Sequence, residues 1–264
     1  MSPILATVLL GIIEGITEFL PISSTGHLLI AEQWLGERSE LFNVAIQAGA
    51  ILAVVVIYWR KLVTLLTRWD DPANRDYLAK LTVSTLILLV LSFAATRLGF
   101  KLPETVKPVA IALALGGVAI LLIEMYVARQ PVRTEVTWKV AVWVALGTVF
   151  AGIFPGTSRS AATIFAAMLV GLTSRPAATE FSFLVGIPTM FAATGYELLK
   201  VRHTAGQQDW NALALGFVVS GIVAFIAVKW LLRYIQSHRF TLFAWYRIAL
   251  GGALLALVAQ GTLR

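Results

Sequence analysis

Two glutamates near the start of the chain have a spacing that suits joint chemistry. Glu14 and Glu18 lie four residues apart, so both carboxylates share one face of a helix. Such a pair suits a divalent cation, with Mg²⁺ or Ca²⁺ as candidates, a shared proton, or general acid and base chemistry. Their neighbours are mostly apolar, and ionisable groups at membrane depth usually mark a functional site. The alternative is a pair of glutamates at a wetted helix end.

A cluster of hydroxyl groups follows the glutamates. Ser23 is a candidate for substrate binding, Ser24 is a candidate nucleophile, and His27 follows three residues later. An imidazole can act as a base, an acid or a metal ligand near neutral pH, and a structural role for His27 is equally acceptable. A serine protease built on Ser24 and His27 is rejected, because it leaves the two glutamates unexplained.

A second polar segment, PGTSRSAAT at 155–163, is suited to binding an anion. Gly156 permits unusual backbone angles, and hydroxyls and amides at a helix start form a nest for anions. Arg159 adds a planar fork of donors that matches phosphate oxygens. The predicted substrate-binding residues around Arg159 are Gly156, Thr157, Ser158, Ser160 and Thr163. The alternative is that Arg159 forms a permanent ion pair with Glu14 or Glu18.

Further polar residues lie within or beside apolar runs. Gln47 either orients a substrate group or bonds a neighbouring helix. Arg175 and Glu180 flank the start of an apolar run, where a helix cap or a salt bridge is expected. Residues near other run ends are expected to reach lipid headgroups, namely Glu124, Glu197 and Arg247.

The composition identifies the environment that holds these groups. Of the 264 residues, 58% are hydrophobic and 13% are charged, and the mean hydropathy is +0.82. A soluble domain of this size cannot bury so much apolar surface, so an all-α polytopic membrane protein is expected. The net charge of +7 does not indicate nucleic acid, because the basic residues lie in short loops between apolar runs. There is no cysteine for a disulfide or thiolate site, and the N-terminus does not resemble a cleavable signal peptide.

Six stretches are long and apolar enough to cross a membrane. They are placed at 42–59, 79–98, 108–128, 181–199, 211–230 and 246–263. Regions 3–36 and 140–173 are apolar but interrupted, and each predicts a helix, a break and a second helix. Broken backbone at membrane depth is tolerated only inside protein or beside a water-filled cavity. Both regions are therefore expected to be re-entrant hairpins that line one cavity.

The two halves of the chain resemble each other, and aligning Pro21 with Pro155 pairs Ser23 with Thr157 and Ser24 with Ser158. Each hairpin is followed by three spans, so the second half enters from the opposite face. This is the plan of an inverted-topology repeat, with a site at the repeat interface. The prediction is a single membrane domain, 1–264, with repeat one at 1–128 and repeat two at 140–264.

The basic residues predict the orientation of the spans. If loop 60–80 is cytoplasmic, thirteen Lys and Arg residues lie on its side, Arg247 among them, against seven on the other. This bias places both termini outside, and the site is then expected to open outward between the first half-helix and the span 42–59. The segment 230–245 is expected to lie at the membrane surface because it combines basic residues with Trp230, Phe240, Phe243 and Trp245.

Two long ungapped motifs carry a family resemblance that extends over essentially the whole chain. The runs EGITEFLPISSTGH at 14–27 and PGTSRSAAT at 155–163 closely resemble the bacterial undecaprenyl-diphosphate phosphatase family, the bacitracin-resistance type. The runs EFSFL at 180–184 and FAWYR at 243–247 are also similar to that family. The resemblance implies six spans with two re-entrant hairpins, and hydrolysis of undecaprenyl diphosphate to undecaprenyl phosphate and inorganic phosphate. This reaction recycles the lipid carrier of peptidoglycan synthesis.

The resemblance also implies where the protein works and which residues act. It implies a multi-pass protein of the bacterial inner membrane, with the active site open to the periplasmic side. The family motifs map onto Glu14, Glu18, His27, Ser158, Arg159 and Thr163. The expected partners are the polyprenyl diphosphate substrate and membrane lipids, with a homodimer as one option and without nucleic acid.

The mechanism expected from these residues leaves one choice open. Arg159, with the Ser158 and Thr163 hydroxyls, holds the terminal phosphate, and Glu14 and Glu18 bind a divalent cation. Either Ser24 attacks while His27 or Glu18 takes its proton, or a cation-activated water attacks directly. A polyprenyl-phosphate flippase or an ion-coupled transporter is the alternative function, because broken helices in inverted repeats are typical of transporters. The chain has no Walker motif for ATP-driven transport.

Overall fold

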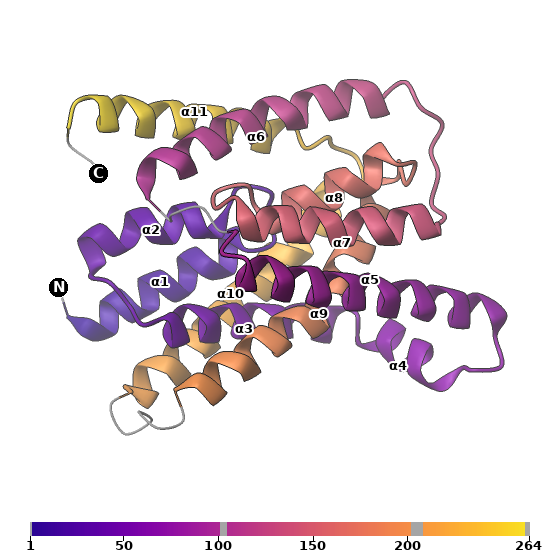
Figure 1. Ribbon diagram of the computed structural model, residues 1–264, viewed down its shortest axis with the longest axis horizontal. Coiled ribbons are helices and arrows are strands. Elements are labelled where there is room, and N and C mark those ends of the chain that lie inside the picture. The colour runs from indigo at the N-terminus through magenta and orange to yellow at the C-terminus, as the bar shows by residue number, and fades with distance from the viewer. Residues whose placement is uncertain (1, 101–104, 202–207, 262–264) are drawn as a thin grey trace.

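The computed structural model describes residues 2–100, 105–201 and 208–261, which form eleven helices and no strand (Figure 1). The helices are α1 (Pro3–Thr17), α2 (Ser24–Leu35), α3 (Glu40–Ile57), α4 (Trp59–Thr67), α5 (Pro72–Arg97), α6 (Val106–Val127), α7 (Trp138–Ile153), α8 (Arg159–Leu169), α9 (Arg175–Lys200), α10 (Trp210–Tyr234) and α11 (Thr241–Ala259). The prediction of an all-helical protein is confirmed.

Six helices are long and apolar enough to span a membrane: α3, Pro72–Ala95 within α5, α6, α9, α10 and α11. They confirm the six predicted spans with shifted ends. The α5 helix begins at Pro72 instead of 79, and α9 begins at Arg175 instead of 181. A proline in the first turn favours a helix start, and the polar residues that follow extend each helix beyond its apolar part. The predicted loop 60–80 contains most of a further helix, α4, which begins at Trp59 and ends at Thr67.

The two interrupted regions each form a helix, a break and a second helix, as predicted. One break separates α1 from α2 and holds Pro21, and the other separates α7 from α8 and holds Pro155. Proline lacks a backbone N–H and clashes with the preceding turn, so neither helix continues through its break. Both breaks end in a helix start, where backbone N–H groups have no partner within the helix.

The two breaks share an unusual backbone conformation at one serine each. Ser23 and Ser158 have φ of 74° and 72°, and they are the non-glycine residues with positive φ in the described part of the chain. Each caps the following helix, because its hydroxyl oxygen accepts from a backbone N–H at 3.3 Å, that of Gly26 or Ala161. This conformation pairs Ser23 with Ser158, so the predicted pairing of Ser24 with Ser158 is wrong by one residue. The second break has one more residue after its proline.

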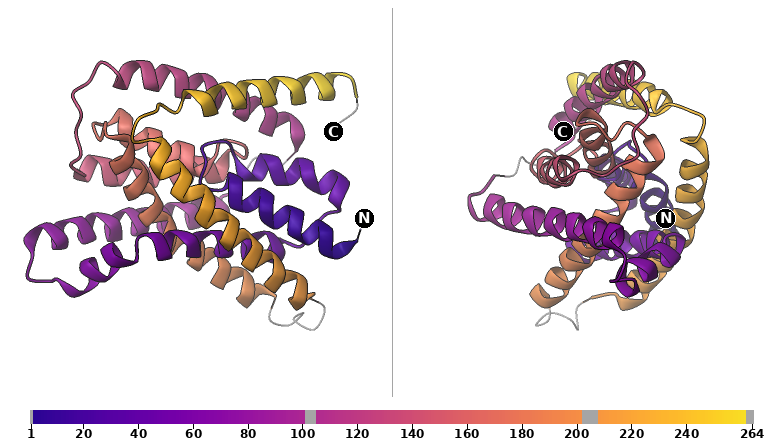
Figure 2. Two further views of the ribbon diagram at one scale, coloured as in Figure 1. Left: turned by 180° about the vertical axis from the view of Figure 1, so that it is seen from behind. Right: turned by 90° about the vertical axis from the view of Figure 1, so that its right-hand side faces the viewer.

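Helices from the two ends of the chain pack closely against each other. The α10 helix crosses α3 and α1 on the back of the molecule (Figure 2), and α11 lies along α6 (Figure 1). Gly15 permits the approach of α1 to α10, because a Cβ there would lie 2.6 Å from the Ser220 carbonyl oxygen. The Ser220 hydroxyl donates to the Ile46 carbonyl at 2.6 Å. Small residues at helix contacts and interhelical hydrogen bonds of this kind are what associate helices in lipid.

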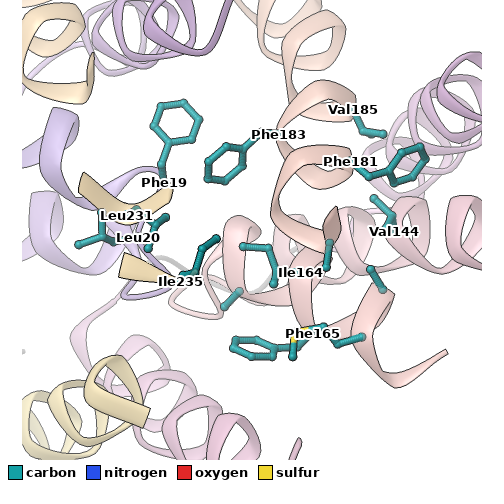
Figure 3. Close-up of a cluster of buried hydrophobic side chains, with 14 of the residues drawn as sticks. Phe19, Leu20, Val144, Ile164, Phe165, Phe181, Phe183, Val185, Leu231 and Ile235 are labelled. Atoms are coloured by element: carbon teal, nitrogen blue, oxygen red, sulfur yellow. The ribbon is translucent and has the colours of Figure 1, made fainter. Parts of the chain in front are cut away.

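The largest apolar cluster joins the first break to the second half of the chain. Phe19, two residues after the end of α1, faces Phe183 of α9 at a ring-centroid distance of 5.0 Å (Figure 3). Ile164 and Phe165 of α8 belong to the same cluster. The beginning of the first break is therefore held against α8 and α9.

Several charged residues lie elsewhere than predicted. Glu124 does not reach headgroups: it is buried, forms an ion pair with Arg175 and accepts from the Phe240 N–H at 2.9 Å. Glu180 pairs with Lys61 of α4, so Arg175 and Glu180 each form a salt bridge, though not with each other. The buried ion pair of Glu124 ties the end of α6 to the starts of α9 and α11.

The expected surface segment 230–245 is only partly a surface feature. Helix α10 extends to Tyr234, and Trp230 and Trp245 are exposed. Phe240 and Phe243 are buried instead, and Phe240 packs on Phe165 at a ring-centroid distance of 5.2 Å. Two of the aromatic residues that were predicted to lie at the membrane surface are therefore part of the apolar core.

Candidate active site

Glu18 connects the two breaks of the chain through its two carboxylate oxygens. The Ser24 hydroxyl donates to Oε2 of Glu18 at 2.5 Å, and Arg159 Nη2 donates to Oε1. Glu18 and Ser24 are buried, and Arg159 is partly exposed. The structure thus brings together three predicted site residues, and Arg159 forms the ion pair with a glutamate that was the alternative to a phosphate-binding role.

Local chain geometry explains why these side chains meet. Glu18 is the first residue after α1, and its backbone N–H still donates to the Glu14 carbonyl. Ser24 is the first residue of α2, and Arg159 is the first residue of α8. Each of the three residues therefore lies at a helix end. Ser24 and Arg159 lie at helix N-termini, where the first backbone N–H groups have no partner within the helix and the helix dipole is positive.

Glu14 lies one turn before Glu18 and is completely buried, at 0% exposure. Neither of its carboxylate oxygens has a hydrogen-bond partner among the described residues. Since buried polar groups are normally paired, this carboxyl is suited to take up a proton or a cation.

The hydroxyl groups at the second break and the start of α8 have different hydrogen-bond partners. Ser160 donates to the Leu20 carbonyl at 2.9 Å, which joins the two breaks directly. Thr163 donates to the Arg159 carbonyl at 2.9 Å within its own helix, and Ser158 lies 3.0 Å from the Ser160 hydroxyl. Gly156 has φ of 88°, and a Cβ there would lie 2.7 Å from the Val109 carbonyl oxygen. A side chain at position 156 is therefore excluded both by conformation and by space.

A small cavity of about 20 Å³ lies beside these groups, and Glu18, Arg159, Ser160, Thr163 and Met190 are among its lining residues. Such a volume holds about one water molecule, which is less than a phosphate group needs. The ion pair between Arg159 and Glu18 lies at the edge of this cavity.

His27 is engaged through both ring nitrogens, and neither contact is with Ser24. Its Nδ1 lies 2.7 Å from the Ser23 carbonyl oxygen, and its Nε2 lies 2.6 Å from the hydroxyl of Tyr246 in α11. Because a carbonyl only accepts, Nδ1 carries a hydrogen, and in a neutral imidazole the Tyr246 hydroxyl then donates to Nε2. The side chain of His27 therefore links the backbone of the first break to α11.

Three predicted substrate-binding residues lie apart from the Glu18 cluster. Ser23 caps α2, and its carbonyl is bound by His27. Gln47 is half-buried in α3 and has no hydrogen-bond partner among the described residues. Thr157 offers its carbonyl to Arg247 and does not line the small cavity. Their predicted roles stay predictions.

Arg247 is a buried site residue that the sequence analysis placed wrongly at the headgroups. It is 0% exposed, and its guanidinium group donates to five backbone carbonyls. The acceptors come from both breaks and from α6: Pro21, Gly156, Thr157, Ala112 and Leu113. One side chain of α11 therefore holds both breaks. Arg247 belongs to the FAWYR run and lies inside a predicted span. That position is the sequence feature that indicates a role in the protein interior.

The hydrogen bonds of Arg247 also orient the amides of the second break. In a trans peptide the C=O and the following N–H point in opposite directions. Because the Thr157 carbonyl points to Arg247 at 2.9 Å, the Ser158 N–H is directed away from it. Arg247 thereby fixes the direction of this amide at the start of α8.

Comparisons with known proteins agree on one family. A family model described as "Bacitracin resistance protein BacA" matches residues 7–253. The chain is 62% identical over 256 residues to the undecaprenyl-diphosphatase of Rhizobium leguminosarum bv. trifolii, with 96% of each chain covered. It is 61% identical over 255 residues to the undecaprenyl-diphosphatase of Rhizobium johnstonii, again with 96% of each covered. It is 54% identical over 264 residues to that of Stenotrophomonas maltophilia, covering 99% of this chain and 100% of the relative.

Proposed function

The chain belongs to the bacitracin resistance protein BacA family and is an undecaprenyl-diphosphatase, and from this premise we propose how its residues carry out the reaction. The substrate is undecaprenyl diphosphate, and the products are undecaprenyl phosphate and inorganic phosphate. We propose that the product returns to peptidoglycan synthesis as lipid carrier. The observation that supports this mechanism best is that Glu18 binds both Ser24 and Arg159.

The terminal phosphate binds at the start of α8. Arg159 exchanges its ion pair with Glu18 for two phosphate oxygens, which its planar fork matches. The backbone N–H groups around Ser158 and the helix dipole add further stabilisation of negative charge. Thr163 lines the small cavity beside Arg159, Ser158 is the residue before Arg159, and both supply hydroxyls. Gly156, Thr157 and Ser160 keep the backbone of this segment in place.

Ser24 attacks the terminal phosphorus, and Glu18 takes its proton. The short hydrogen bond from the Ser24 hydroxyl to Glu18 has the geometry of a nucleophile and its base. The new bond joins Ser24 Oγ to phosphorus, the bond from phosphorus to the bridging oxygen breaks, and undecaprenyl phosphate leaves with the proton that Glu18 passes to the freed oxygen. Glu18, again a carboxylate, then accepts a proton from the water that attacks the phosphoserine. The bond from phosphorus to Ser24 Oγ breaks, inorganic phosphate leaves, and Glu18 returns the proton to Ser24 Oγ. His27 supports the first break and does not act as the base.

Glu14 and Glu18 fit a divalent cation, Mg²⁺ or Ca²⁺. The unpaired, buried carboxyl of Glu14 is the observation that favours this site. Within the described residues no group of three or more His, Cys, Asp and Glu side chains surrounds a single point, so diphosphate oxygens would complete the ligand set. A bound cation supplies charge neutralisation for the diphosphate.

The membrane arrangement follows from the same features. The α1/α2 and α7/α8 pairs form two re-entrant hairpins of an inverted repeat, supported by the matching serines at 23 and 158 and by the three long helices after each pair. Since Arg247 is buried, it is left out of the count of basic residues in the loops. Twelve basic residues then lie on the side of loop 60–80 and seven on the other side, which still favours a cytoplasmic loop 60–80. The site then faces the periplasm of the inner membrane. A homodimer is compatible with this plan.

Chelation tests the cation and the enzyme together. We expect purified protein in detergent to release phosphate from undecaprenyl diphosphate, and chelation to lower the rate at least tenfold. Adding back an excess of Mg²⁺ or Ca²⁺ should restore it. Full activity after exhaustive chelation would contradict the cation, while no release from folded protein would contradict the phosphatase mechanism and favour a transporter.

Trapping the intermediate tests the role of Ser24. Substrate labelled in the terminal phosphate, quenched with acid during turnover, should leave label on Ser24, detected by peptide mapping. Ser24→Ala should carry no label, and Ser23→Ala serves as the neighbouring control that keeps it. Near-normal turnover by Ser24→Ala would show that water attacks directly.

A further inference from the structure

One hydroxyl group in the small cavity beside Glu18 and Arg159 has no hydrogen-bond partner. Within the described part of the chain, the hydroxyl side chains that line this cavity are Thr148, Ser160, Thr163 and Ser182. The first three each donate to a backbone carbonyl, at 2.9 to 3.0 Å. Ser182 is only 5% exposed, and its hydroxyl oxygen has no hydrogen-bond partner among the described residues. The mechanism above does not use this side chain.

The hydroxyl of Ser182 is available to a group outside its own helix. A serine or threonine inside an apolar helix commonly donates to the carbonyl one turn earlier. Thr189 and Thr194 of α9 do so, at 3.3 and 2.8 Å. Ser182 lies on the same helix and lacks such a bond. Because a buried polar group without a partner is costly, its presence beside the reacting groups indicates a ligand in the cavity.

The size and lining of the cavity suit a single water molecule. Its volume is about 20 Å³, and a bound water needs about 10–15 Å³ and two to four polar partners. Glu18 can accept a hydrogen bond from this water, Arg159 can donate one, and the Ser182 hydroxyl can do either. The other walls include the apolar side chains of Phe19, Ile51 and Phe183, so the polar side of the cavity holds the water.

We propose that this cavity binds the water that hydrolyses the phosphoserine, and that the Ser182 hydroxyl holds this water in place. The proposal rests on the phosphatase mechanism above and adds a residue to its second half. The water oxygen bonds to phosphorus, the bond from phosphorus to Ser24 Oγ breaks, and Glu18 takes one proton of the water and passes it to Ser24 Oγ. Ser182 Oγ accepts a hydrogen bond from the other O–H, which turns a lone pair of the water toward phosphorus.

The cavity lies on the side of Glu18 that this step requires. Glu18 binds Ser24 through Oε2 and Arg159 through Oε1, and the cavity is lined by Glu18 and Arg159 but not by Ser24. The attacking and leaving oxygens of a phosphoryl transfer lie roughly in line across phosphorus. Water must therefore approach from the side opposite Ser24 Oγ, once undecaprenyl phosphate has left. A phosphate held between Ser24 and Arg159 exposes that side to the cavity.

The two halves of the reaction should respond differently to the loss of this hydroxyl. The bridging oxygen of the substrate carries no hydrogen, so it needs no acceptor, whereas the water does. Protein in detergent is mixed with substrate labelled in the terminal phosphate and then with excess unlabelled substrate, and acid-quenched samples give the label on Ser24 over time. We expect Ser182→Ala to gain label at the normal rate and to lose it about tenfold more slowly, as for one hydrogen bond missing from a transition state.

Ser84→Ala is the matched control for Ser182→Ala. Ser84 of α5 is 0% exposed, its hydroxyl has no hydrogen-bond partner among the described residues, and it does not line the cavity. Because each variant removes a buried hydroxyl that has no protein partner, both should fold. Ser84→Ala should gain and lose the label at the normal rates.

A second variant removes the room for water and keeps the Ser182 hydroxyl. Gly186 of α9 lines the cavity, and a Cβ there would meet Ile51 Cδ1 at 3.8 Å, which is an ordinary contact. The methyl group of Gly186→Ala narrows a cavity that holds about one water, so this variant should also lose the label more slowly. Gly195→Ala is its control on the same helix, because no atom lies within 4 Å of its added Cβ and Gly195 does not line the cavity.

The time courses separate the role of Ser182 from the phosphoserine itself. Slower gain and slower loss of label by the same factor in Ser182→Ala would overturn the proposal, because Ser182 would then contact the phosphate. Normal loss of label in Ser182→Ala, or equally slow loss in Ser84→Ala, would overturn it as well. These results leave the phosphoserine in place. Absence of label from the unmodified protein would instead overturn the phosphoserine, and the proposal with it.

Discussion

The Arg159→Lys protein should hydrolyse undecaprenyl diphosphate about 10²–10³-fold more slowly than the unmodified protein, in line with the loss of a donor that stabilises transition-state charge. Lysine keeps the positive charge and can still pair with Glu18, so the protein should fold. It cannot place two N–H donors on two phosphate oxygens at once. Steady-state kinetics should show the loss in kcat, and inorganic phosphate should become a weaker inhibitor.

Arg175→Lys is the matched control for that experiment. Arg175 binds the buried carboxylate of Glu124 through two nitrogens, and the pair lies away from the Glu18 cluster. The same substitution there should lower thermal stability while kcat stays close to normal. If Arg159→Lys hydrolyses substrate at the normal rate, Arg159 does not clamp the phosphate.

Replacing Arg247 by lysine should lower kcat/KM about 10²-fold. A displacement of about 1 Å in the residues that position a substrate has an effect of this order. A lysine has three donors and cannot satisfy the five carbonyls that Arg247 binds. The Ser158 amide and the Ser24 hydroxyl would then lose their fixed positions. Kinetics on protein that elutes as the unmodified form in gel filtration measure the effect.

Two glycine variants separate positioning from general damage. A Cβ at Gly116 would clash with the Arg247 guanidinium group, so Gly116→Ala should lower kcat in the same direction. Gly252→Ala is the control on α11, because no atom lies within 4 Å of its added Cβ. Added guanidinium ion should partly restore an Arg247→Ala protein. Normal kcat in Arg247→Lys, or no rescue of Arg247→Ala, would mean that Arg247 does not position the breaks.

The helices could be predicted largely from hydropathy, because each span must satisfy its own backbone hydrogen bonds in lipid. The breaks could be predicted from Pro21 and Pro155 for the same backbone reason. The start of α5 at Pro72 was missed, because its first residues are polar and hydropathy does not register them. The pairing of Ser23 with Ser158 was missed by one residue, because it depends on backbone conformation and not on residue type.

The contact of Glu18 with Arg159 was foreseen as an alternative, because an intramembrane carboxylate and an intramembrane arginine stabilise each other. Arg247 and Glu124 were misplaced, because their sequence positions near span ends match those of headgroup anchors equally well. Only the packing of α11 on α6 shows that both side chains point inward. The bond between His27 and Tyr246 joins residues 219 positions apart, which no local pattern reveals.

The position of Arg247 has a consequence for protein synthesis. The guanidinium group that holds both breaks belongs to α11, which leaves the ribosome after the other ten described helices. Until α11 is inserted, the carbonyls of Pro21, Gly156 and Thr157 lack this donor. A nascent chain therefore carries the residues of the phosphatase without this link between the breaks, and we expect hydrolysis to begin only when α11 has reached its place.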